Sequence, residues 1–127
     1  MDNPSVVLLV EDDPVMSDLV SLVLDRNMGL QVITATNGQE ALSLFQEHQP
    51  GIVILDILLP HMNGLELLRR LNEQKDLDRT HVIVTSALGY QEIVKQAVEA
   101  GAKDFLVKPF NVEDLVQRVS QALGKDT

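Results

Sequence analysis

The sequence predicts an α/β fold, in which a doubly wound sheet of five parallel strands carries helices on both faces. Apolar runs of strand length alternate five times with segments whose apolar residues recur at helical spacing. The apolar runs are almost uninterrupted, which is typical of strands buried on both faces of a parallel sheet. The 127 residues suffice for one domain, and we expect its core over residues 6–123, with short tails.

The first strand and helix are predicted between Val6 and Gly29. The apolar run Val6 to Val10 ends in three acids, residues 11–13. Pro14 suits the first turn of a helix, acids suit the positive end of its dipole, and Gly29 suits its end. The apolar residues at helical spacing in this segment are Met16, Leu19, Val20, Val23 and Leu24.

The second and third strands differ in character. Residues 31–35 mix polar and apolar side chains, as expected of a less covered edge strand. Asn37 and, three residues later, Glu40 form a helix-start pattern in which the asparagine caps the helix. The apolar run Ile52 to Leu55 then leads directly into Asp56, and we expect this strand in the middle of the sheet.

The second half of the chain repeats the alternation. Asn63 and Glu66 predict another helix start, and the charged residues 75–79 predict a loop. The remaining predicted elements are a helix to about Gln74, a strand over Val82 to Val84, a helix carrying Ile93, Val94, Ala97 and Val98 that stops near Gly101, a strand over Phe105 to Val107, and a helix between Asn111 and Gly124.

The apolar character of the strands predicts their order. The first, third and fourth strands are the most apolar and should be central, which leaves the second and fifth at the edges. The order 2-1-3-4-5 satisfies this requirement, and it is the flavodoxin-like arrangement. In such a sheet ligands bind beyond the carboxyl ends of the strands, at the crevice between strands one and three.

Composition excludes several classes of function. The formal net charge of −9 argues against direct nucleic-acid binding and favours cations and basic partner surfaces. There is no cysteine, so neither disulfides nor thiolate metal sites are expected. No apolar run approaches the ~20 residues of a membrane span, no signal peptide is evident, and we expect a cytoplasmic protein. The histidines 48, 61 and 81 are interpreted as surface or loop residues.

Polar side chains follow four of the five predicted strands. Glu11 and Asp12 follow the first strand, Asp56 the third, Thr85 the fourth and Lys108 the fifth. Parallel strands end at one edge of the sheet, so the three carboxylates of the adjacent first and third strands should meet. Such carboxylates repel one another strongly, and either some protonate or a cation lies among them.

Oxygen ligands without histidine or cysteine favour Mg²⁺, which usually also takes a phosphate oxygen. Asp56 could then act as a nucleophile towards phosphorus, while Lys108 and Thr85 bind phosphoryl oxygens. Taken singly, each residue has an ordinary interpretation. The acids after the first strand could be helix-start residues, Asp56 a cap, Thr85 a strand-end residue and Lys108 a solvated lysine. Asp13 is interpreted as a helix-start acid. Their joint placement at four strand ends favours the functional interpretation.

Five segments resemble motifs of the receiver domain of bacterial two-component response regulators, the family of the chemotaxis response regulator. They are Leu8–Asp13, Asp56–Gly64, Val84–Ala87, Ala100–Ala102 and Lys108–Phe110, and the resemblance extends from Val6 to Leu123. It implies that Asp56 accepts a phosphoryl group from the phosphohistidine of a sensor kinase or phosphotransfer protein. It further implies Mg²⁺ ligands at Glu11, Asp12, Asp56 and the Leu58 carbonyl, and a cis bond between Lys108 and Pro109.

The resemblance also implies a switch rather than an enzyme with substrates of its own. Phosphorylation would draw Thr85 inward, and Phe105 would follow. The face formed by the fourth helix, fifth strand and fifth helix would then change its contacts with a downstream effector domain or protein. Leu58 and Ala87 are apolar and cannot orient an attacking water, which predicts a long-lived phosphorylated state.

Two other functions compete with this interpretation. A Mg²⁺-dependent phosphatase or phosphotransferase for small molecules should carry a capping insertion, and the sequence has none of sufficient length. A nucleotide- or flavin-binding module should have a glycine-rich loop after the first strand, where this chain has three acids. The controlled output stays open, as do homodimerisation and the choice between a stand-alone regulator and part of a larger protein.

Overall fold

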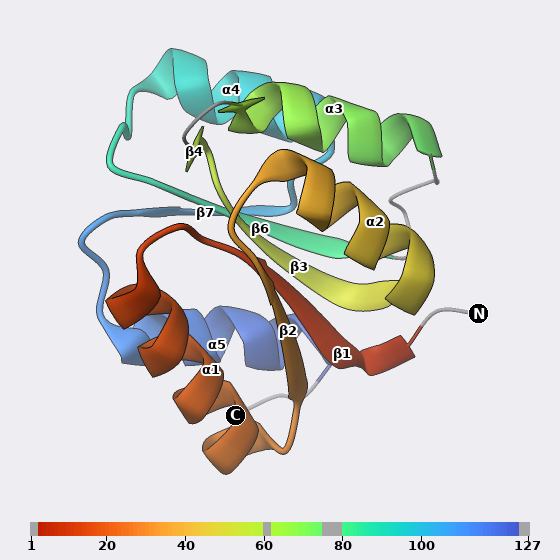
Figure 1. Ribbon diagram of the computed structural model, residues 1–127. Coiled ribbons are helices and arrows are strands. Elements are labelled where there is room, and N and C mark those ends of the chain that lie inside the picture. Colours follow the sequence, from red (N-terminus) through yellow and green to blue (C-terminus); the bar gives the residue numbers. More distant parts are fainter. Residues whose placement is uncertain (1–2, 60–61, 75–79, 125–127) are drawn as a thin grey trace.

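A computed structural model describes residues 3–59, 62–74 and 80–124. Its main sheet has five parallel strands in the order β2-β1-β3-β6-β7 (Figure 1). These strands are β1 (Asn3–Val10), β2 (Gln31–Ala35), β3 (Pro50–Asp56), β6 (His81–Ser86) and β7 (Asp104–Val107). The predicted order 2-1-3-4-5 is confirmed, because β4 (Leu58–Leu59) and β5 (Met62–Asn63) pair only with each other, in a separate antiparallel hairpin.

Helices cover both faces of the sheet, as predicted. In Figure 1, α1 and α5 lie on one face, and α2, α3 and α4 lie on the other. The helices are α1 (Pro14–Met28), α2 (Gly38–His48), α3 (Gly64–Gln74), α4 (Gln91–Glu99) and α5 (Val112–Ala122). Within the described parts of the chain, no helix is both long enough and apolar enough to cross a bilayer.

The core consists of two apolar layers separated by the sheet. Alternate residues of each central strand enter opposite layers, so that Leu8 faces α2, α3 and α4 while Val7 and Leu9 face α1 and α5. Phe45 of α2 and Leu24 of α1 are fully buried anchors of the two layers. Burial on both faces is the physical reason why the central strands are apolar throughout.

Side-chain caps set the predicted helix starts. Asp13, Asn37 and Asn111 each accept a hydrogen bond from a backbone N–H in the first turn of the helix that follows, at 3.0, 2.9 and 2.9 Å respectively. Such bonds satisfy donors that a helix leaves unpaired. The predicted start at Asn63 is confirmed too, because its Oδ1 accepts from Leu65 N at 2.8 Å.

Several elements differ from the predictions. Strand β1 begins at Asn3 rather than Val6, and the hairpin of β4 and β5 was not predicted because two-residue strands leave no periodic pattern. Leu19 and Val98 occur at helical spacing, yet they are 42% and 57% exposed. The predicted loop over residues 75–79 lies outside the described residues.

The surface-or-loop interpretation of histidine is wrong for His81. This residue begins β6, is half-buried, and places Nε2 2.6 Å from Asp104 Oδ2 on β7. Arg118 of α5 donates to the other oxygen of Asp104 at 2.9 Å. His48 ends α2 and is half-buried, and His61 lies outside the described residues.

Gly64 begins α3 where the chain passes very close to Ile57, and its N–H donates to the Ile57 carbonyl at 2.9 Å. A Cβ at this position would lie 2.5 Å from that carbonyl oxygen. We predict that Gly64→Ala lowers the free energy of unfolding by about 3 kcal/mol, as expected of overpacking against backbone. Urea denaturation measures this change.

Gly29→Ala is the matched control for that substitution. Gly29 ends α1 with a φ of +65°, and a Cβ there would meet nothing within 4 Å. Its cost is therefore backbone strain alone, about 1–2 kcal/mol. Equal losses in the two variants would contradict the close approach of Gly64 to Ile57.

Candidate functional site

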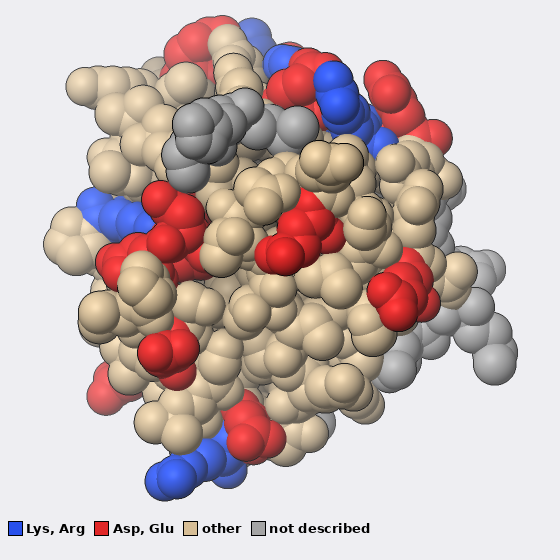
Figure 2. Space-filling model, viewed as in Figure 1, with Lys and Arg blue, Asp and Glu red and all other residues tan. Residues whose placement is uncertain are grey.

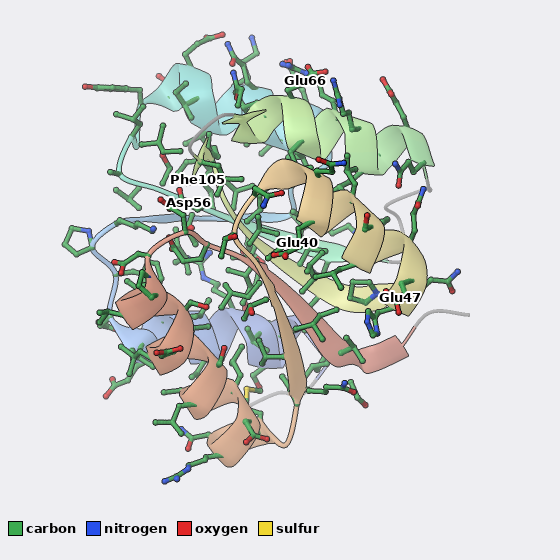
Figure 3. The ribbon with its side chains drawn as sticks, in the orientation of Figure 1. Glu40, Glu47, Asp56, Glu66 and Phe105 are labelled. Atoms are coloured by element: carbon green, nitrogen blue, oxygen red, sulfur yellow. The ribbon has the colours of Figure 1, made fainter. Side chains whose placement is uncertain are left out.

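The carboxyl ends of the sheet strands bring the predicted site residues together. Asp56 ends β3, at the edge of the sheet where the strands end, whereas Glu47 and Glu66 lie on helices away from that edge (Figure 3). In the strand register, Asp56 is the direct partner of Thr85 on β6. Because β1 lies beside β3, the residues that follow β1 reach the same place.

Three carboxylates cluster at this edge, as the sequence predicted. Glu11, Asp12 and Asp56 each offer an oxygen, and these oxygens lie within 4.8 Å of one another. Glu11 and Asp56 are only 4% and 5% exposed, while Asp12 is exposed. Hard oxygen ligands at this spacing suit a divalent cation such as Mg²⁺, and the exposed Asp12 leaves the cluster open to solvent.

Lys108 balances the two buried acids. Its Nζ donates to Glu11 Oε1 at 2.6 Å and to Asp56 Oδ2 at 3.0 Å. A buried carboxylate without such a partner would be strongly unfavourable. Lys108 also forms the cis peptide bond with Pro109 that the family resemblance implies.

These contacts shift two pKa values. Burial raises the pKa of Glu11 above its usual value, although Lys108 and the Asp13 N–H partly offset it. Burial alone would lower the pKa of Lys108, but its hydrogen bonds to Glu11 and Asp56 outweigh that effect and raise it. Lys108 is therefore a fixed positive charge, and acidification protonates Glu11 earlier than an isolated glutamate.

Backbone N–H groups hold the acids in place. Asp56 Oδ1 accepts from Leu58 N at 3.0 Å, so the two oxygens of Asp56 point to different partners. Glu11 Oε2 accepts from Asp13 N at 3.2 Å. The carboxylates of Asp56 and Glu11 are thus oriented before any ligand arrives, which lowers the entropy lost on binding.

The remaining predicted residues surround this centre. Thr85 is 2% exposed, and Phe105 on β7 is partly buried against the layer that contains α2, α3 and α4. Leu58 is 48% exposed and Ala87 is also exposed; they lie two residues after Asp56 and Thr85 respectively. Asp13 caps α1, which agrees with its interpretation as a helix-start acid.

Sequence reasoning missed two features of the site. It assigned Lys108 to phosphoryl oxygens but not to Glu11, because no pattern links residues 97 positions apart. It also overlooked Ser86, which is fully buried, accepts from Leu88 N through Oγ at 2.9 Å, and accepts from Lys108 N through its carbonyl at 2.7 Å. Its place directly after Thr85 was the only available signal.

Comparison with known proteins gives a consistent result. Residues 7–120 match the family model described as response regulator receiver domain. The chain is 36% identical over 120 residues to chemotaxis protein CheY of Bacillus subtilis, covering 93% of this chain and 97% of that protein. The solved receiver domain of Francisella response regulator 1452 superposes with a TM-score of 0.86 at 30% identity, covering 96% of this chain and 98% of that one.

Another relative is longer. The chain is 35% identical over 119 residues to the DNA-binding dual master transcriptional regulator RpaA of Synechocystis, covering 94% of this chain. That match spans 49% of the length of RpaA. Proteins similar to this chain therefore include one of about its own length and one about twice as long.

The acid cluster makes a prediction about stability. Three carboxylates face one ammonium group, so Asp56→Asn removes repulsion while Lys108 keeps its bond to Glu11. We expect the melting temperature without metal to rise by a few degrees, equivalent to about 1 kcal/mol. Mg²⁺ should raise the melting temperature of the wild type by linkage, and that of the variant by less.

Asp18→Asn is the control for this experiment, because it removes the same charge from an exposed position of α1. Its melting temperature and its response to Mg²⁺ should match the wild type. An Asp56→Asn melting temperature at or below that of Asp18→Asn, measured by calorimetry without metal, would contradict repulsion within the cluster.

Proposed function

Because the chain belongs to the response regulator receiver domain family, we propose that it is a phosphorylation-dependent switch whose phosphoacceptor is Asp56. The phosphoryl donor is the phosphohistidine of a sensor kinase or of a phosphotransfer protein. The observation that carries the proposal is the position of Asp56, a buried carboxylate with two further acids beside it and Lys108 in contact. Residues 1–127 form one receiver domain in this proposal.

The residues that would hold Mg²⁺ are Glu11, Asp12, Asp56 and the carbonyl of Leu58. Glu11 and Asp12 follow β1, and Asp56 ends the adjacent β3, which supports a shared ion. The ion would supply positive charge that attracts the phosphoryl oxygens towards the acids. The open side of the cluster at Asp12 provides the approach.

In the transfer step, a carboxylate oxygen of Asp56 forms a bond to phosphorus as the bond from phosphorus to the imidazole nitrogen breaks. The bonding electron pair leaves with the imidazole. Lys108, which contacts Asp56 Oδ2 before transfer, is placed to donate to a phosphoryl oxygen afterwards. The hydroxyl of Thr85, whose backbone pairs with Asp56, donates to another.

A rim of apolar side chains supports docking of a protein donor. Val15, in the first turn of α1, is 75% exposed, and Leu58 is 48% exposed. Pro109 is exposed on the side of Lys108. An acidic centre with apolar surroundings suits a partner that brings its own histidine into the site.

The output surface comprises α4, β7 and α5. Thr85 moves towards the phosphoryl group, and Phe105 follows into the space it leaves. Exposed apolar or aromatic side chains on or next to α4 and β7 suit contact with an effector domain or protein. They are Tyr90, Val98 and Val107, which are 69%, 57% and 48% exposed.

Direct nucleic-acid binding by this domain is not part of the proposal. Figure 2 shows acids spread over the face in view and basic residues only in small separate groups.

A small-molecule phosphatase or phosphotransferase is the second candidate from the sequence. The described residues include no insertion that could cover a small substrate above Asp56. A signalling protein without substrates of its own therefore fits better than a small-molecule phosphatase. Turnover of small phosphoesters above the rate of an Asp56→Asn variant would reverse this preference.

Labelling tests the proposed function directly. With acetyl phosphate and Mg²⁺, the chain should gain one phosphoryl group at Asp56, detected by intact mass and by peptide mapping. Asp56→Asn should gain none, and Asp18→Asn should label like the wild type. Labelling at another residue, or no labelling of the wild type, would refute the proposal.

The lifetime of the phosphorylated state should be long, because Leu58 and Ala87 cannot orient water. Leu58→Gln introduces a side chain that can, and we expect hydrolysis to accelerate several-fold in a time course after removal of the donor. Leu22→Gln is the control, since Leu22 of α1 is 47% exposed. Rapid hydrolysis by the wild type, or equal rates in both variants, would contradict this account.

A further inference from the structure

The connection between β6 and α4 lies directly against β7. A Cβ on Gly89 would lie only 2.8 Å from Val107 Cγ2 and 3.2 Å from Val107 Cγ1. Side-chain atoms at that distance overlap, so a side chain at residue 89 would require either Val107 or the backbone of residue 89 to shift. Gly89 and Val107 are both exposed, and the contact therefore lies at the surface rather than in the core.

This contact joins two segments that carry phosphoryl-binding residues in the proposed function. Val107 directly precedes Lys108, and Gly89 lies four residues after Thr85. Between them, Ser86 accepts from Lys108 N through its carbonyl and from Leu88 N through its hydroxyl. Ser86, the last residue of β6, is thus hydrogen-bonded to the residue that follows β7, and Gly89 of the connection lies close to Val107.

The contact also precedes α4, a helix whose start has no side-chain cap. Helix α4 begins after Tyr90, which makes no side-chain capping bond, unlike Asp13, Asn37 and Asn111 before α1, α2 and α5. Only Ala97 of α4 is buried. The position of its first turn therefore depends on the packing of Ile93 against the core and on how the preceding residues pack.

We propose that Gly89 is a positioning residue: its lack of a side chain lets the connection pack on Val107 and couples the start of α4 to the strand end that carries Lys108. This inference rests on the proposed function and adds a residue to it. A side chain at position 89 pushes the connection away from β7. It thereby opposes the inward movement of Thr85 that phosphorylation requires.

Beryllofluoride with Mg²⁺ tests this inference, because the pair mimics an aspartyl phosphate without turnover. We expect Gly89→Ala to weaken beryllofluoride binding at least fivefold by calorimetry. Val107→Ala removes both methyl groups that the new Cβ would meet, so the double variant should return to within twofold of the wild type. Gly29→Ala, where a Cβ meets nothing within 4 Å, should also stay within twofold of the wild type.

Two results would overturn the inference. One is unchanged binding in Gly89→Ala, and the other is failure of Val107→Ala to restore binding, which would show that the effect does not pass through this contact. Mg²⁺ affinity should be equal in all these variants, since none alters the acid cluster. A wild type that binds no beryllofluoride would instead remove the proposed function, and this inference with it.

Discussion

The structure depends on one interaction, the contact of the Lys108 ammonium with two buried carboxylates at the carboxyl edge of the sheet. Glu11 and Asp56 are almost inaccessible, and removing the partner of such a buried ion pair typically costs about 3–5 kcal/mol. The end of β7 is therefore tied to the ends of β1 and β3 across the sheet. The same contact brings together the residues that the proposed function assigns to Mg²⁺ and to the phosphoryl group.

The sheet is what makes that contact possible. Parallel register places Asp56 beside Thr85 and aligns the strand ends along one edge, while apolar layers on both faces keep the strands central and rigid. Charged groups can then be held close together with little movement. This preorganisation is the physical basis for the proposed chemistry, because groups that are already oriented need little rearrangement when phosphate arrives.

Much of this arrangement could be predicted from the sequence, because its signals are local. Apolar runs predicted the five strands and their order, and Asp13, Asn37 and Asn111 predicted helix starts that their hydrogen bonds confirm. Contacts between distant residues could not be predicted in this way. The pairing of Glu11 with Lys108 and of His81 with Asp104 depends on side-chain reach across the fold, on which periodicity carries no information. The exposure of Leu19 could not be predicted for the same reason. Helical spacing assigns a residue to one face of a helix but does not show whether that face is buried in the core.

Lys108 neutralises the acids that would hold the metal, so the ammonium group and Mg²⁺ would share one cluster of carboxylates. The most direct test is the Mg²⁺ affinity of Lys108→Met, measured by calorimetry beside the wild type and beside Lys95→Met, which removes the same charge from an exposed position of α4. We predict several-fold tighter Mg²⁺ binding by Lys108→Met, because one positive charge beside the acids is gone, and unchanged binding by Lys95→Met. Equal or weaker binding by Lys108→Met would contradict it.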